Sequence, residues 1–363
     1  MIERFVYEQL PGRIIFGPGT LRELQEEAAR LGAARALVVS TPGHRQFAEE
    51  AARLLGARAG GIYAQAVMHV PVETSRAACN EARRLGADCV VAIGGGSTIG
   101  LAKAIALETA LPILAVPTTY SGSEMTPIYG LTEGGRKRTG RDLRVLPKTV
   151  IYDPVLTLDL PPHVTGPSGM NAIAHCVEGL YSQQANPMTS LMAAEGIRAL
   201  SKSLVTCVHD PQDLTARTEA LYGAWVAGAV LGTVRTALHH KLCHVLGGSF
   251  NLPHAETHTI ILPHAVAYNA AAAPDAMRAI AAALPIRDPA GVPGALYDLA
   301  VSLGARVALR DIGLSESDLD RAADIACASL YPNPRPVERP AMRELLDQAF
   351  RGVRPAHGPW CPL

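Results

Sequence analysis

The chain has 363 residues, 48% of them hydrophobic, and its 33 lysines and arginines balance 33 aspartates and glutamates, so the formal net charge is zero. This length is ample for two or three domains with large buried cores. The balanced charge excludes a strongly basic chain, so neither nucleic acid nor an anionic membrane is expected as the main partner.

Hydropathy and cysteine usage indicate the compartment. Charged residues, glycine or proline interrupt every apolar run of 18 residues, so no transmembrane helix is expected. The first residues contain no apolar secretory core. The seven cysteines are odd in number and include no Cys-x-x-Cys pair. These features favour reduced thiols in a cytoplasmic protein over a disulfide framework.

Short apolar segments alternate with amphipathic ones through residues 1–155, and this alternation predicts βαβ units with a mostly parallel sheet. Continuously apolar strands are typical of a sheet that helices cover on both faces. Helices are predicted at residues 20–31, from Pro42 onward and at residues 73–85. Strands are predicted at residues 13–16, 36–39, 61–68, 89–93, 113–116 and 149–152.

Two of these helices have recognisable start signals. Thr20 and Glu23 have the spacing of a capping box, in which each side chain hydrogen-bonds a backbone N–H near the other residue. Thr41 is expected to cap the following helix, with Pro42 in its first turn, where the missing N–H is not needed.

A glycine-rich loop, Gly94-Gly95-Gly96-Ser97-Thr98-Ile99-Gly100, joins a predicted strand to a predicted helix. Consecutive glycines let backbone N–H groups approach a diphosphate, and the helix N-terminus adds a positive dipole end. The loop lacks the Gly-x-Gly-x-x-Gly spacing, because the third glycine position holds Ile99. A nucleotide-binding loop and a structural tight turn therefore both remain open at this point.

A second polar loop, residues 117–126, follows the next predicted strand and contains Thr118, Thr119 and Tyr120. Ligands of open α/β sheets bind at the carboxyl ends of the strands, so two such loops favour a nucleotide site over ordinary turns. Residues 128–141 then predict a hairpin. Its basic residues, including Arg138, are either a solvated face or a clamp for an anionic ligand.

The second half of the chain, residues 156–363, has few β-branched runs and long Ala- and Leu-rich segments with helical period, which predicts an all-helical domain. Proline and glycine separate these segments. Helices are predicted at residues 170–182, 187–204, 214–231, 237–246, 262–272, 274–284, 295–303, 316–328 and 340–350.

Six of the twelve histidines lie between His239 and His264. Helical spacing puts Asn171 and His175 on one face, and His240 and His244 on another. Such a cluster predicts either a metal site or a site of proton transfer. The segment starting at His254 does not have the His-Glu-x-x-His order, so a metallopeptidase is not indicated.

These motifs together resemble the iron-containing, or group III, alcohol dehydrogenase family. The resemblance covers nearly the whole chain, and within the family it is strongest to the maleylacetate reductase branch. The motifs that carry it are Gly94-Gly-Gly-Ser97 with Lys103, residues 117–127 and 134–141, Asp153-Pro154, Ser168–Glu178, His239–Gly248 and His254–His258.

The resemblance implies a dehydroquinate synthase-like fold, with a Rossmann-like dinucleotide-binding domain at residues 1–155, an all-helical catalytic domain at residues 156–363, and NADH or NADPH bound between them. Many NAD-specific members have an aspartate after the second strand, where this chain has Ser40-Thr41, so both cofactors are expected. The residues implied for the cofactor are Gly94, Gly95, Gly96, Ser97, Thr118, Thr119, Ser40, Thr41 and Lys148.

Metal-dependent members of the family bind their metal with one aspartate and three histidines. The matching positions are Asn171, His175, His240 and His254. A neutral amide is a much weaker ligand for a divalent cation than a carboxylate. We therefore expect no obligatory metal, although His175, His240 and His254 would be the ligands if one bound.

The resemblance implies reduction of the carbon–carbon double bond of maleylacetate, a dicarboxylate keto acid, to 3-oxoadipate, as in the degradation of aromatic compounds. His244 and His240 are expected to act as acid or electrostatic stabiliser, assisted by Lys241, His175 and His254. The substrate is expected to contact Asn171, His175, His254, Arg138 and Tyr120.

Three other interpretations remain open. The first is a metal-dependent alcohol dehydrogenase or aldehyde reductase of the same family. The second is a biosynthetic reductase of another unsaturated keto acid, since fold and cofactor do not fix the substrate. The third is a nucleotide-binding protein without catalysis. The family also implies a homodimer, with a strand near residues 5–8 pairing between subunits.

Overall fold

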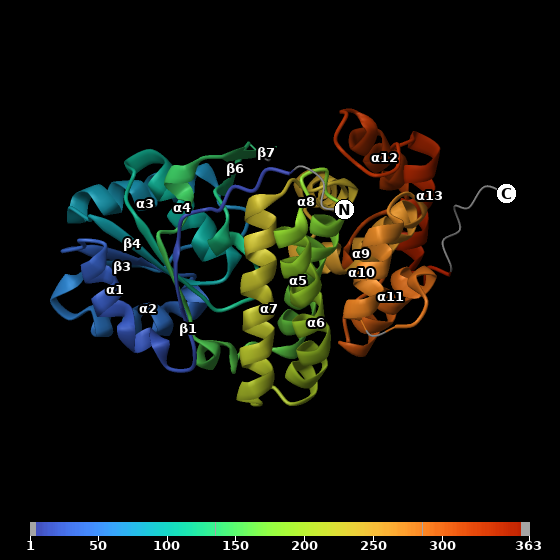
Figure 1. Cartoon of the computed structure of the whole chain (residues 1–363). Helices are drawn as coiled ribbons and strands as arrows, with labels where there is room; N and C mark the ends of the chain where they lie inside the picture. The colour runs from blue at the N-terminus through green and yellow to red at the C-terminus, as the bar shows by residue number, and fades with distance from the viewer. Residues whose placement is uncertain (1–4, 135, 285, 357–363) are drawn as a thin grey trace. The chain divides into compact units, whose positions relative to one another are not determined.

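The structure is a computed structural model that describes residues 5–134, 136–284 and 286–356, and it divides into two compact units. Gln9–Leu160 forms an α/β unit, and residues 161–356 form a helical unit that also includes residues 5–8. The predicted fold class, a parallel sheet followed by an all-helical part, is confirmed (Figure 1). The sequence predicted that the helical domain begins near residue 156, a few residues before this division.

Six parallel strands form the sheet of the α/β unit, in the order β1-β8-β5-β4-β2-β3. The four inner strands are buried along their whole length, which explains their continuously apolar sequences. The strand predicted at residues 61–68 forms earlier and is shorter. The strands are β1 Arg13–Phe16, β2 Ala36–Val39, β3 Ala59–Tyr63, β4 Cys89–Gly94, β5 Ile113–Pro117 and β8 Thr149–Tyr152.

Helices and one hairpin complete the α/β unit. The hairpin predicted from residues 128–141 is confirmed as the antiparallel pair of β6 (Ile128–Glu133) and β7 (Arg136–Arg141). A glycine-initiated helix follows β4, as predicted from the loop at Gly94. The α-helices are α1 Leu24–Arg30, α2 Arg45–Leu55, α3 Val72–Leu85 and α4 Gly96–Thr109.

Lys103 of α4 connects this helix to the hairpin. Its ammonium nitrogen donates to the carbonyl and hydroxyl oxygens of Thr126 at 2.8 and 2.9 Å and to the carbonyl of Ile128 at 2.7 Å. Burial lowers the pKa of Lys103 to about 7, and the neighbouring Glu124 opposes that shift. Lys103, a residue of the family motif, thus binds the end of the second polar loop and the start of β6.

The capping box predicted from Thr20 and Glu23 is wrong. The Thr20 hydroxyl donates back to the carbonyl of Gly17 at 2.8 Å and forms no cap. The backbone N–H groups of Gly19 and Leu21 donate instead to the carboxylate of Asp153, at 2.9 and 3.0 Å. Since Asp153 directly follows β8, the strand next to β1, a tertiary partner has replaced the local one.

The helical unit consists of nine α-helices within the described residues. The three long helices α5, α6 and α7 pack side by side (Figure 1). Most helices match their predicted segments, but α5 and α9 begin eight residues earlier, at 162 instead of 170 and at 254 instead of 262. They are α5 Pro162–Leu180, α6 Pro187–His209, α7 Leu214–Thr233, α8 Leu238–Phe250, α9 His254–Asn269, α10 Pro274–Ala283, α11 Val292–Ser302, α12 Leu319–Cys327 and α13 Arg339–Arg351.

The long helix α5 lies in the centre of this unit and is buried over most of its length. Glycines permit the close approach of its neighbours. A Cβ atom on Gly169 would lie 2.3 Å from the Leu204 side chain of α6, and one on Gly179 would lie 2.3 Å from Val230 of α7. This close packing holds the polar residues of α5 in a dry interior.

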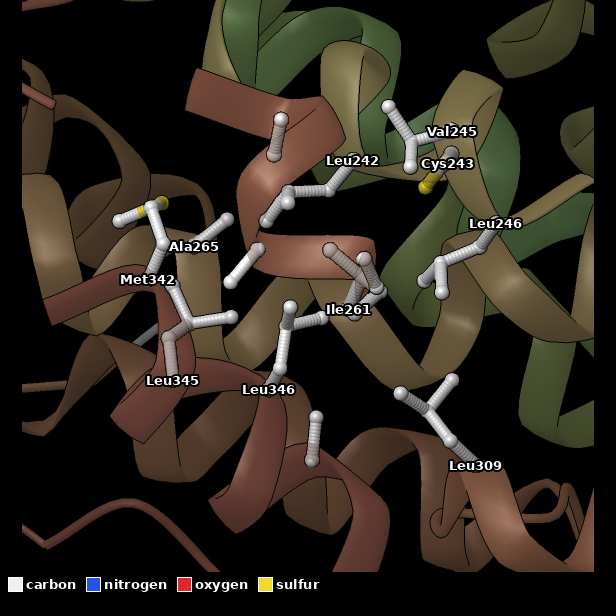
Figure 2. Packing of buried hydrophobic residues seen from close by; sticks show 14 of the residues in the cluster. Leu242, Cys243, Val245, Leu246, Ile261, Ala265, Leu309, Met342, Leu345 and Leu346 are labelled. Carbon is white, nitrogen blue, oxygen red and sulfur yellow. The ribbon is translucent and has the colours of Figure 1, made fainter. Parts of the chain in front are cut away.

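A tight turn between α8 and α9 positions the histidine segment. Asn251 ends α8 in the left-handed conformation, with φ at 55°, and Pro253 then sets the start of α9. On the opposite side, Leu242 and Leu246 of α8 pack with Ile261 of α9 and Leu345 of α13 in one apolar core (Figure 2). The core thereby fixes the faces that carry the histidines.

Two further expectations concern segments outside these cores. Residues 5–8 form no strand in the single chain, so the pairing predicted between subunits stays a prediction. Among the described residues, no individual helix is long and apolar enough to cross a membrane. Only α7 and α8 taken together are long and apolar enough, and the chain bends by 95° between them.

The role of Asp153 leads to a stability prediction. Replacing Asp153 with alanine removes the acceptor for two buried or half-buried N–H groups at the first turn after β1, so we expect the free energy of unfolding to fall by about 1–2 kcal/mol. Urea denaturation measures this loss. The exposed Asp159 is the matched control, and its alanine variant should change stability by less than about 0.5 kcal/mol. Equal losses in the two variants would contradict the assignment.

Candidate active site

Three helices of the helical unit bring the predicted histidines together. Asn171 and His175 of α5 are 3% exposed, and His240 of α8 is 5% exposed. Helical spacing puts Asn171, His175 and the next-turn residue Glu178 on one side of α5. The His254–His258 pair also lies on one helix, as the sequence predicted on condition that Pro253 starts it.

A continuous line of hydrogen bonds crosses from α8 to α5. The His240 Nδ1 atom lies 2.7 Å from Glu178 Oε2, and the other ring nitrogen of His240 lies 3.0 Å from His175 Nδ1. The His175 Nε2 atom lies 3.3 Å from the amide nitrogen of Asn171. We call these four residues, Glu178, His240, His175 and Asn171, the polar chain.

The two ends of the polar chain determine its proton positions when both rings are neutral. A carboxylate accepts, so His240 carries its proton on Nδ1 and accepts through Nε2. His175 then donates from Nδ1 and accepts from the Asn171 amide through Nε2. Asn171 Oδ1 is buried and has no hydrogen-bond partner among the residues that the structure describes. The chain therefore ends at an acceptor oxygen that a bound molecule can use.

Glu178 is the residue that the sequence analysis did not assign. Its carboxylate is fully buried and accepts from the backbone N–H groups of Ala237 and His239, both at 2.8 Å, and of His240 at 3.4 Å. These groups are the unpaired donors at the start of α8. Glu178 thus anchors α8 and orients His240 at once. Its position three residues after His175 was the available signal.

His244 and His254 differ from the polar chain because they are exposed. The ring of His244 lies 6.2 Å from that of His240, and the ring of His254 lies 4.3 Å from that of His258. The structure therefore places the two predicted catalytic groups at the outer side of a buried histidine cluster. In this position they can exchange protons with solvent.

Two histidines that the sequence analysis left without a role, His239 and His258, are fully buried between α8 and α9. Their rings are hydrogen-bonded, with His239 Nε2 2.9 Å from His258 Nδ1. Burial lowers the pKa of both imidazoles well below the usual value, and the surrounding histidines lower it further. Both rings are consequently neutral at physiological pH.

Lys241 does not join the histidines. Its ammonium nitrogen donates to the Ser329 hydroxyl at 3.0 Å and lies 5.6 Å above the ring of Tyr331. One step along a helix turns the side chain by about 100°, so Lys241 leaves the face that carries His240. The expected contribution of Lys241 to catalysis therefore stays a prediction.

The glycine loop of the α/β unit packs so closely against neighbouring side chains that a Cβ atom would not fit at Gly94 or Gly95. Gly94 has φ at 149°, and a Cβ atom there would lie 2.5 Å from the Thr98 hydroxyl. A Cβ atom on Gly95 would lie 2.9 Å from Thr119 of the second polar loop. The two loops lie side by side because Gly94 pairs with Pro117. No side chain caps α4, so its first turn can receive an anion.

The remaining predicted residues of the α/β unit lie in different environments. The Ser40 side chain is fully buried and its hydroxyl donates to the carbonyl of Thr41, while the Thr41 hydroxyl lies 2.9 Å from the ring of His44. Thr41 thus occupies the predicted cap position without capping the helix. Tyr120 is fully buried, and its predicted substrate contact stays a prediction. Ser97 and Thr119 are half-buried, Thr118 is buried, and Lys148 and Arg138 are exposed.

The ligand set implied by the family lacks the anionic donor that a divalent metal favours. Its four side chains, Asn171, His175, His240 and His254, contain no anionic donor. Three of them, Asn171, His175 and His240, are already hydrogen-bonded in series. Among the described residues, the one group of three potential ligands whose donor atoms lie within 4.8 Å of one another is His239, Cys243 and His258.

Comparison with known proteins gives a consistent result. Residues 11–154 match the family described as iron-containing alcohol dehydrogenase, and residues 165–350 match the C-terminal region of the Fe-containing alcohol dehydrogenase family. Maleylacetate reductase of Burkholderia cepacia is 57% identical over 97% of this chain and 99% of its own length. Maleylacetate reductase of Sphingobium indicum is 54% identical over the same shares.

Solved structures show the same similarity. The crystal structure of maleylacetate reductase from Rhizobium sp. strain MTP-10005 has a TM-score of 0.92 and 50% identity, covering 98% of this chain and all of that one. An iron-containing alcohol dehydrogenase from Corynebacterium glutamicum has a TM-score of 0.91 and 42% identity, covering 98% of both chains. The polar chain and the glycine loop therefore lie within a fold that the relatives share over its full length.

The anchoring role of Glu178 can be tested by stability. Glu178→Ala leaves the N–H groups of Ala237 and His239 and the ring N–H of His240 unpaired in the interior, so we expect a loss of at least about 3 kcal/mol in the free energy of unfolding. Chemical denaturation followed by circular dichroism measures it.

The matched control for this variant is Glu219→Ala. Glu219 forms a partly exposed ion pair with Arg198, and such a pair contributes about 1 kcal/mol or less. If both alanine variants lost the same small amount, the buried carboxylate would not be the anchor of α8.

Proposed function

The chain belongs to the iron-containing alcohol dehydrogenase family, and from this membership we propose that it is an NAD(P)H-dependent oxidoreductase that reduces the carbon–carbon double bond of maleylacetate, giving 3-oxoadipate. The strong identity to reductases of that name over nearly the full chain supports the substrate. The observation that carries the mechanism is the polar chain, in which an amide and two imidazoles occupy the positions of metal ligands.

The glycine loop fits the cofactor. A diphosphate needs backbone close to it, and any side chain on Gly94 or Gly95 would collide with Thr98 or Thr119. When bound, the reduced nicotinamide supplies a hydride. No carboxylate follows β2, where Ser40 and Thr41 stand, so nothing at this position repels a 2′-phosphate. We therefore propose that NADH and NADPH are both used.

The substrate needs an electrophilic site and a proton. Hydride adds to the alkene carbon β to the ketone, the electron pair moves onto the ketone oxygen, and the resulting enolate is protonated at the α-carbon. A group that donates to the ketone oxygen stabilises this charge as it develops. The histidines of the helical unit, with His240 held by Glu178 and His244 and His254 exposed, provide the donors.

The roles of the histidines follow from their positions. Glu178 fixes the orientation of the His240 ring, because His240 Nδ1 lies 2.7 Å from the Glu178 carboxylate in a buried environment. We propose that His240, through His175, keeps the polar chain polarised, while His244 or His254 delivers the proton. Arg138 remains the proposed partner for a substrate carboxylate, since it is an exposed guanidinium.

We propose that no resident metal takes part. The family ligand set lacks its carboxylate, because Asn171 stands at the position of the aspartate. Three imidazoles with an amide offer no charge to offset that of a divalent cation. The polarising role that metal-dependent relatives give to a cation would belong here to protonated histidine. The homodimer implied by the family resemblance is part of the same proposal.

Removal of metal tests this proposal directly. The purified protein is treated with a strong chelator, dialysed and assayed for NADH and NADPH oxidation with maleylacetate. We expect an unchanged rate, because the donor set contains no anion for a divalent ion. A rate that collapses on chelation and returns with iron or zinc would instead establish the metal-dependent interpretation.

The Asn171→Asp variant sharpens the same experiment. The substitution restores the carboxylate of the metal-dependent relatives without changing the size of the side chain. It should increase the affinity for zinc at least about tenfold over that of the original protein, measured by calorimetry. Equal affinities would contradict the argument that the amide excludes the metal.

Catalysis by histidine is tested by substitution. His240→Ala removes the centre of the polar chain and His244→Ala removes an exposed proton donor, so we expect turnover to fall by about 10²–10⁴ in each. Steady-state NADH oxidation with maleylacetate measures this. His209, an exposed histidine at the end of α6, is the control and should retain full turnover as alanine. Near-normal rates in both His240→Ala and His244→Ala would overturn the assignment.

A further inference from the structure

Beside the polar chain lies a second constellation that the proposed reaction does not use. His239 and Cys243 are one turn apart on α8, and His258 faces them from α9. His239 Nε2 lies 2.9 Å from His258 Nδ1 and 3.8 Å from Cys243 Sγ, and the three donor atoms all lie within 4.8 Å of one another. We call this group the His–Cys–His triad.

The triad is enclosed. His239 and His258 are 0% exposed and Cys243 is 1% exposed. The cysteine belongs to the apolar core between α8, α9 and α13, where it lies beside Val245 and Leu246 (Figure 2). An apolar shell excludes water and disfavours hard cations that keep their hydration. The site therefore admits only an ion that gives up its water for nitrogen and sulfur donors.

The donors of the triad are soft. A thiolate and two imidazoles are ligands that select zinc, monovalent copper and similar ions over magnesium or calcium. The thiolate also provides the negative charge that the set Asn171, His175, His240 and His254 lacks. Binding breaks the S–H bond of Cys243 and releases its proton. The proton that lies between His239 Nε2 and His258 Nδ1 moves to the outer nitrogen of its own ring, so that both inner nitrogens can bind the ion.

We propose that His239, Cys243 and His258 bind a thiophilic monovalent cation, with Cu(I) as the ion of this class that matches the donors. One thiolate and one monovalent cation make a neutral unit, which is the least costly charge state to bury in an apolar core. A divalent ion would leave a net positive charge there. The bound ion would join α8 to α9, the two helices that present His240, His244 and His254.

The probe for this site is Cu(I) itself, added without oxygen to the full-length protein in the presence of a chromophoric competitor that removes loosely held copper. We expect one equivalent to remain. X-ray absorption should show one sulfur and two imidazole nitrogens around copper. Copper should also raise the melting temperature, because it binds the folded chain at a preformed site.

Variants locate the ion. Cys243→Ala should weaken Cu(I) binding by at least about a hundredfold, because it removes the only anionic ligand. The matched control is Cys327→Ala, which removes a half-buried free thiol outside the triad and should leave binding unchanged. His175→Ala, at a family ligand position, should leave it unchanged as well.

Two results would overturn the proposal: no retained copper in the wild-type protein, or equal retention in Cys243→Ala. Loss of copper in His175→Ala with full retention in Cys243→Ala would do the same. If Cys243→Ala does not fold, the absorption spectrum of the wild-type protein decides, since a copper site without a sulfur neighbour excludes the triad. The proposal does not depend on the reaction, so its failure would leave the maleylacetate assay unaffected.

Discussion

The helical unit depends on one buried negative charge. Glu178 is fully buried, and within the described residues no lysine or arginine forms an ion pair with it. Its partners are instead three backbone N–H groups at the start of α8, the imidazole N–H of His240, and the Tyr181 hydroxyl at 3.5 Å. A carboxylate without a cation needs this many donors to remain in a dry interior. The hydrogen bonds that Glu178 of α5 accepts therefore hold the start of α8 against α5.

The sequence was sufficient for features that arise from local periodicity. Apolar runs predicted the inner strands of the sheet, and the spacing of His240 and His244 predicted a shared helix face. The glycines after β4 predicted a strand-to-helix turn with room for a phosphate. These features depend on residues that are close in the sequence, so the local sequence alone is enough to predict them. The predicted clustering of the histidines also rested on the family resemblance, which covered the whole chain.

The sequence was insufficient where a distant partner decides. Glu178 accepts from residues about sixty positions later, and Asp153 takes over the cap that Thr20 and Glu23 suggested. Lys241 stands within the histidine segment but turns toward Ser329. The start of α9 at His254 was obscured because Pro263 lies inside that helix. For Glu178, Asp153 and Lys241, a tertiary contact that forms only when the elements pack overrides the local signal.

The amide of Asn171 gives the site a property that a carboxylate could not. If a proton enters at His240, the hydrogen bond between His240 and His175 and the one between His175 and Asn171 can both reverse direction, while His240 keeps donating to Glu178. Asn171 has only to turn its amide so that Oδ1 accepts from His175. An ionised aspartate has acceptors alone and would trap the chain in one polarity. The exchange of one carboxylate oxygen for NH₂ therefore allows the hydrogen bonds between His240, His175 and Asn171 to point in either direction. Charge can enter and leave without displacing a ring.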